Sequence, residues 1–121
     1  MIEIKDLTKE FQTADGTVEA LRNVNLNIQD GDIYGIIGMS GAGKSTLVRC
    51  INMLERPTKG QVLIDGQDIA KLSDKELRAV RRDVTMIFQG FNLLMQRTCL
   101  KNICFPLELI GMDKEKAKKR A

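Results

Sequence analysis

The stretch GIIGMSGAGKSTLVRC, residues 35–50, decides the fold of this chain. Its middle, residues 38–45, fits the pattern G-x-x-x-x-G-K-[ST], and apolar residues at helical spacing follow it. Glycines allow a loop to turn its backbone amides inward around a phosphate. The helix that begins near Lys44 points its unpaired amides and the positive end of its dipole at the same anion. The stretch therefore predicts a phosphate-binding loop between a strand and a helix.

Each residue of this loop has an expected role. Lys44 adds a positive charge between the β- and γ-phosphates, Ser45 supplies a hydroxyl to Mg²⁺, and Thr46 reaches another phosphate oxygen. A glycine-rich turn with an exposed lysine is the alternative, but it leaves the joint spacing unexplained. The predicted nucleotide-binding residues of the loop are Gly38, Met39, Ser40, Gly41, Ala42, Gly43, Lys44, Ser45 and Thr46.

The strands expected around this loop are of two kinds. Residues 2–8 alternate apolar and polar side chains, and so does the second half of residues 18–28. This predicts an antiparallel pair joined by a turn at Asp15-Gly16. Residues 33–38 and 84–89 are apolar without alternation, which is typical of strands buried on both faces. The fold class that this combination predicts is α/β, with Tyr34 in the core.

Helical spacing recurs along the rest of the chain. Residues 45–55 follow the loop, and residues 73–83 begin with Ser73 as N-cap and Glu76 three positions later, a capping-box pattern. Further helices are expected at residues 99–110, interrupted by Pro106, and after the cap residue Asp113.

Composition limits the classes of function. The chain has 121 residues, 43% of them hydrophobic and 29% charged, which is typical of one globular domain. A net charge of +3 is too small to indicate a nucleic-acid-binding surface. Three cysteines and no histidine indicate reduced thiols and no zinc or iron site. The sequence has no secretory signal pattern and no apolar run of the roughly 20 residues that span a bilayer.

These features together resemble the nucleotide-binding subunit of ABC transporters. The resemblance rests on the antiparallel opening, the loop motif, PTKGQVLIDGQDI at 57–69 and VTMIFQGFNLL at 84–94, and it covers nearly the whole chain. Within the family, residues 33–60 are most similar to importers of amino acids, methionine in particular. The resemblance implies a P-loop NTPase fold with ATP and Mg²⁺ as cofactors. It also implies an antiparallel β region at 1–32, a P-loop core at 33–89, and the start of the helical subdomain at 90–121.

Two residues outside the loop gain roles from this resemblance. Gln89 corresponds to the glutamine that touches Mg²⁺ or the attacking water, so the expected catalytic pair is Lys44 and Gln89 and the expected metal pair is Ser45 and Gln89. A lone amide at the end of an apolar strand is also where parallel sheets place site residues, although a turn with Gly90 is the alternative. Phe11 resembles the aromatic that stacks on adenine, and packing in the core is its alternative.

The resemblance further implies partners and a location. The partners are a transmembrane permease subunit and a second ATP-binding subunit. This chain is expected to lie peripherally at the cytoplasmic face of the membrane, or in the cytoplasm if it is a free fragment. Phe91, Leu93 and Leu94 either face the permease or pack inward.

Several motifs of the family are not found before Ala121: the signature motif, the acidic strand end, the catalytic glutamate and the switch histidine. We therefore expect a sheet truncated before its second half, in a chain that binds Mg·ATP without useful hydrolysis. A non-catalytic nucleotide-binding fragment and a cytosolic ABC-type ATPase without a membrane partner remain alternatives.

Overall fold

The computed structural model describes residues Met1–Ala121. The chain divides into two compact units, Met1–Met86 and Ile87–Ala121, and each is described by itself. None of the helices in either unit combines the length and the apolar character needed to span a bilayer.

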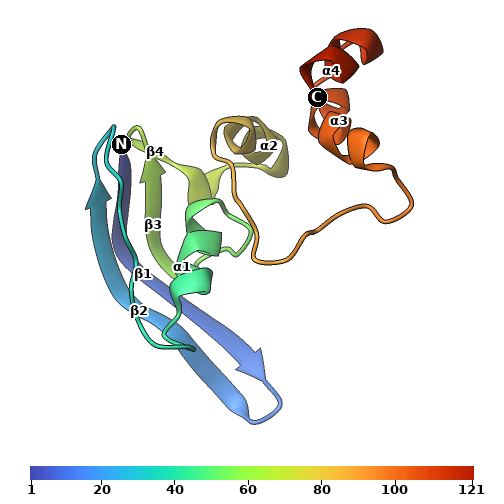
Figure 1. Ribbon diagram of the computed structural model, residues 1–121. Helices are drawn as coiled ribbons and strands as arrows, with labels where there is room; N and C mark the ends of the chain where they lie inside the picture. Colours follow the sequence, from blue (N-terminus) through green and yellow to red (C-terminus); the bar gives the residue numbers. More distant parts are fainter. The chain divides into compact units, whose positions relative to one another are not determined.

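An antiparallel sheet forms the frame of the first unit (Figure 1). Its strands are β1 (Ile2–Thr13), β2 (Gly16–Ile28), β3 (Lys59–Ile64) and β4 (Gln67–Asp68), in the order β2-β1-β3-β4. β1 and β2 form a long hairpin, so the predicted antiparallel opening is confirmed. The turn lies at residues 14–15, and Gly16 already pairs with Thr13, one position earlier than predicted.

The core of this unit lies between the sheet and three helices, one of which separates β2 from β3 in the sequence. The helix α1 (Lys44–Ile51), the short helix η1 (Ile69–Lys71) and α2 (Asp74–Asp83) all contribute buried side chains. α2 begins with the predicted capping box. The Ser73 hydroxyl accepts a hydrogen bond from the Glu76 amide, and the Glu76 carboxylate accepts one from the Ser73 amide. The core side chains are Ile4, Leu7, Leu21, Leu47, Cys50, Met53, Val62, Ile69 and Leu77.

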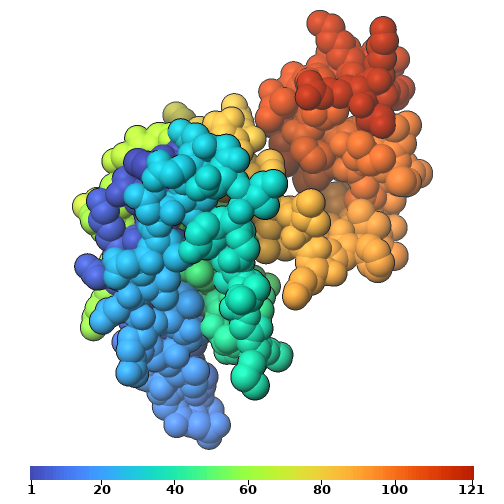
Figure 2. Space-filling view, turned by 60° about the vertical axis from the view of Figure 1, so that its left-hand side comes forward, coloured from blue at the N-terminus to red at the C-terminus, as the bar shows by residue number.

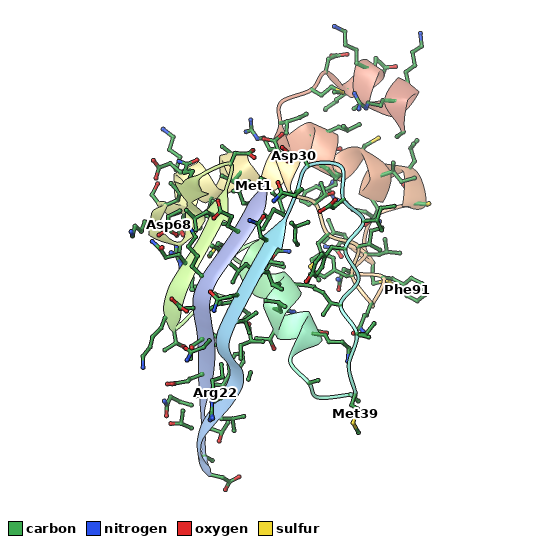
Figure 3. The ribbon with its side chains drawn as sticks, turned by 90° about the vertical axis from the view of Figure 1, so that its left-hand side faces the viewer. Met1, Arg22, Asp30, Met39, Asp68 and Phe91 are labelled. Carbon is green, nitrogen blue, oxygen red and sulfur yellow. The ribbon has the colours of Figure 1, made fainter.

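The start of β1 is fixed by charge. The amino group of Met1 donates to Asp30 and, at 2.6 Å, to Asp65, and Figure 3 shows Met1 beside Asp30. The hydrogen bond to Asp30 has the largest effect and the one to Asp65 the next largest. Both raise the pKa of this amino group above its usual value.

The second unit contains α3 (Cys99–Leu109) and α4 (Lys114–Arg120), which pack against each other. Thr98 caps α3, and Asp113 caps α4 as predicted, by accepting from the amides of Glu115 and Lys116. The predicted interruption at Pro106 is wrong, because α3 continues through it to Leu109. Proline removes one helical donor, and here the helix tolerates that loss.

Both apolar strands predicted around the loop are wrong, because residues 33–38 and 84–89 are coil. Ile33, Ile37 and Ile87 are exposed at 103%, 95% and 99%, and Tyr34 is 47% exposed instead of lying in the core. A strand is held by hydrogen bonds to a neighbouring strand, and neither segment pairs with the sheet. Apolar composition alone therefore did not make a strand here.

Candidate nucleotide-binding site

The predicted loop is fixed at its downstream end by Gly43. This residue precedes α1 in the left-handed conformation, with φ of +82°. A Cβ added there would lie 2.5 Å from the carbonyl oxygen of Ala20 and 3.0 Å from Leu21 Cδ2. Only glycine combines this backbone conformation with such a close approach. The end of the loop is therefore held against β2.

The loop closes around its own lysine. Lys44 Nζ donates to the carbonyl oxygens of Gly38 and Met39, at 2.6 Å each. The amide of Ala42 donates to the Met39 carbonyl at 3.2 Å, which tightens the same turn. Figure 3 shows Met39 at the outer bend of the loop, where its side chain is 84% exposed. The structure thus places an ammonium group inside the loop, next to the start of α1.

The first turn of α1 offers free backbone donors. The first helical hydrogen bond runs from the Leu47 amide to the Gly43 carbonyl at 2.9 Å, and no side chain caps the helix. The amides of Lys44, Ser45 and Thr46 therefore have no acceptor one turn back. The first turn of the helix also contains no acidic residue. A helix end of this kind attracts anions.

These groups fit a polyphosphate, which needs donors and a cation in a concave turn. They also fit Mg²⁺, which keeps several waters and needs few protein oxygens. The exposed Ser45 hydroxyl is the oxygen that the loop presents, and no group of three or more His, Cys, Asp or Glu side chains is placed to hold a metal ion.

Phe11 lies on β1 in the same unit as the loop. Its ring is half-buried and is not among the core side chains. The ammonium group of Lys9 lies 4.7 Å from the ring centroid. Contact between Phe11 and a nucleotide base stays a prediction. Sequence reasoning missed this contact of Lys9. It could have been found, because residues i and i+2 of a strand lie on the same face.

Gln89 lies in the second unit, in an exposed coil. Its predicted contact with Mg²⁺ or water stays a prediction. Of the apolar residues after it, Phe91 and Leu93 are exposed at 93% and 55%, while Leu94 is half-buried.

Asn102 of α3 organises the chain just before that helix, and sequence reasoning missed it. Its Oδ1 accepts from the Leu94 amide at 2.8 Å. Its Nδ2 lies 3.1 Å from the carbonyl of Leu94, 3.2 Å from that of Arg97 and 3.0 Å from that of Thr98. One amide side chain therefore satisfies several backbone groups of residues 94–98. No periodic pattern in the sequence signals such a role.

The thiols contribute no reactive group beside the loop. Cys50 of α1 is fully buried, and burial raises its pKa to about 11. The group therefore stays protonated at neutral pH. Cys104 is also buried, Cys99 is exposed, and all three are free.

Comparison with known proteins identifies the class. The ABC transporter family matches residues 21–121, so the chain belongs to this family, as the sequence predicted. The chain is 58% identical to methionine import ATP-binding protein MetN 2 of Lactiplantibacillus plantarum and 56% identical to MetN of Staphylococcus haemolyticus, over its whole length. It is 52% identical to MetN of Escherichia coli over 99% of its length. It spans only 35%, 36% and 35% of these three relatives.

Solved structures confirm the predicted fold class. The dimeric structure of MJ0796, a bacterial ABC transporter cassette, matches with a TM-score of 0.91 and 41% identity, over 99% of this chain and 53% of that one. A post-hydrolysis state of the same cassette, bound to ADP and Pi, also matches with a TM-score of 0.91, at 40% identity and the same coverage.

Proposed function

We propose that this chain is the ATP-binding part of the energising subunit of an ABC importer for methionine or another amino acid. The observation that carries the proposal is the loop itself, which holds the Lys44 ammonium beside the free amides of α1. The names of the relatives support the importer class and methionine as its substrate. Because the chain spans about a third of those relatives, hydrolysis and its coupling to transport are proposed for the whole protein.

The chain's own residues supply binding and charge. Lys44 now contacts two carbonyls, and binding requires that it exchange them for phosphate oxygens. Part of the binding free energy from the contact between Lys44 and phosphate therefore offsets the loss of the two hydrogen bonds to the carbonyls. The amides at the start of α1 donate to the phosphates without moving a side chain, and Ser45 offers its hydroxyl to the metal. ATP and Mg²⁺ together supply the triphosphate and the charge that neutralises it.

The remaining assignments belong to the same proposal. Phe11 stacks on the base, and Gln89 serves as the second metal and catalytic residue. The chain comprises an antiparallel β region at 1–32, a P-loop core at 33–89 and the start of the helical subdomain at 90–121. The bound ADP and Pi in one similar structure and the dimeric form of that cassette support a nucleotide ligand and a second ATP-binding subunit. A transmembrane permease subunit completes the assembly, with this chain bound at the cytoplasmic face of the membrane.

The substitution Lys44→Ala tests the proposal. Loss of one charge-assisted hydrogen bond costs about 1.5–3 kcal/mol, so affinity for Mg·ATP should fall roughly ten- to hundredfold. Titration with a fluorescent ATP analogue measures the dissociation constant. Lys75→Ala, on the exposed side of α2, is the matched control and should leave it unchanged. An unaltered dissociation constant for Lys44→Ala refutes the role of Lys44 in nucleotide binding.

A further inference from the structure

We propose that Lys9 is a positioning residue, which fixes the ring of Phe11 for contact with the nucleotide base. The inference rests on the proposed function and adds a determinant of base recognition to it. It stands on the contacts that Lys9 makes in three directions.

The first contact is with the ring. Lys9 and Phe11 lie two residues apart on β1, so their side chains share one face of the sheet. Lys9 Nζ lies 4.7 Å from the ring centroid, within the range of a cation–π attraction. Because the ammonium takes one face of the ring, a stacking base uses the other face.

The second contact fixes the ammonium itself. Lys9 Nζ donates to the Arg56 carbonyl at 2.9 Å and lies 3.3 Å from the Glu55 carboxylate. The Lys9 side chain is only 14% exposed, so few other arrangements keep its charge paired. Glu55 and Arg56 follow α1, the helix that begins at the loop. Lys9 therefore connects the aromatic ring to the far end of that helix.

The third relation is with the loop. Lys9 pairs with Leu21, whose side chain lies next to Gly43 at the end of the loop. The register of the hairpin shifts after the Lys9–Leu21 pair, because Glu10 pairs with Glu19 and Ala20 of β2 is left without a partner on β1. Bulges of this kind re-aim side chains and are frequent beside functional sites. The charges of Lys9 and Glu55 also act on the pKa of the buried Cys50, lowering and raising it respectively, which agrees with their position against α1.

Base and phosphate therefore have separate supports, which an experiment can distinguish. Lys9→Met keeps the apolar stem and removes the charge. Affinity for ATP should fall about three- to tenfold, because the ring loses the contact that orients it. Affinity for inorganic tripolyphosphate, which has no base, should not change. Lys9→Arg should restore ATP binding, since a guanidinium reaches the same partners.

The measurement is isothermal titration of the 121-residue chain with each ligand in the presence of Mg²⁺. Lys5→Met is the matched control, because Lys5 also lies on β1 in an ion pair, 3.0 Å from Glu3, and should bind both ligands normally. In a Phe11→Ala background, Lys9→Met should have no further effect. Should Lys9→Met fail to fold, Glu55→Gln carries the test and should give a smaller loss in the same direction, for ATP alone.

The outcomes separate the two proposals. If the unsubstituted chain binds neither ligand, the proposed function fails and the inference fails with it. If it binds both, while the Lys9 or Glu55 variant weakens both ligands equally or neither, only the inference is overturned. A Lys9→Met effect that persists without Phe11 overturns it as well.

Discussion

The paired strands and the apolar coils of this chain have similar side chains, but those of the strands are buried and those of the coils are exposed. Ile4 on β1 and Val62 on β3 are exposed at 2% and 0%, whereas Ile37 and Ile87 are exposed at 95% and 99%. β1 and β3 are neighbours in the sheet, and the coils have no neighbour. Apolar character therefore sets what a segment could bury, while a neighbouring strand decides whether the segment becomes a strand.

The difference also shapes the candidate site. Gly43, at the downstream end of the loop, rests against β2, but the segment 33–38 at the upstream end joins no strand. Figure 2 shows the chain between β2 and α1 at the surface of the first unit. The loop therefore has one fixed end, and the lysine contacts to Gly38 and Met39 hold the other.

The largest expected effect lies in the paired sheet. Leu7 on β1 is fully buried, so Leu7→Ala loses apolar contacts and leaves a cavity. The free energy of unfolding should fall by about 2–5 kcal/mol. Urea denaturation followed by circular dichroism measures it. A loss below about 1 kcal/mol would show that the sheet is no better packed than the coils.

A smaller effect is expected where local chemistry, not a neighbouring strand, fixes an element. Ser73→Ala removes the oxygen that accepts the Glu76 amide at the start of α2. Loss of such a cap costs about 0.5–2 kcal/mol in the free energy of unfolding. The same urea titration checks this, with Ser73→Thr as the control that keeps a hydroxyl.

The cap also predicts a pH dependence. Two hydrogen bonds from Ser73 lower the pKa of Glu76 below its usual value. The bond from the hydroxyl has the larger effect, followed by the bond from the amide. A carboxyl with a lowered pKa stabilises the fold above its unfolded pKa, and this contribution is lost as pH falls through the folded pKa. The stability difference between the unsubstituted chain and Glu76→Gln should therefore be present at pH 7 and diminish in acid. A difference that stays constant down to pH 2 would contradict this origin.

The smallest effect is expected in the coils. Ile37→Asn and Ile87→Asn replace side chains that are almost fully exposed, so each should change the free energy of unfolding by less than about 0.5 kcal/mol. Both should reduce binding of the dye ANS, because they remove exposed apolar surface. A loss above about 2 kcal/mol for either variant would show that its segment is buried in solution, and the comparison would then fail.

Sequence reasoning succeeded where local rules suffice. Alternation predicted the β1–β2 hairpin, and the caps at Ser73 and Asp113 follow from hydrogen bonds within one turn. It failed for residues 33–38 and 84–89, since continuous apolar composition does not say whether a neighbouring strand is present. The roles of Lys9 and Asn102 depend on contacts with residues that are distant or irregular, so no periodic signal contains them.

The sequence by itself determined the loop motif, the order of hairpin and helices, and the family, because spacing and short-range hydrogen bonds carry that information. Only the tertiary structure decided that Gly43 rests on β2, that Lys9 joins Phe11 to the residues after α1, and that two apolar segments stay outside the sheet. The physical reason is that each of these depends on which backbone and side-chain groups from elsewhere in the chain come within contact distance.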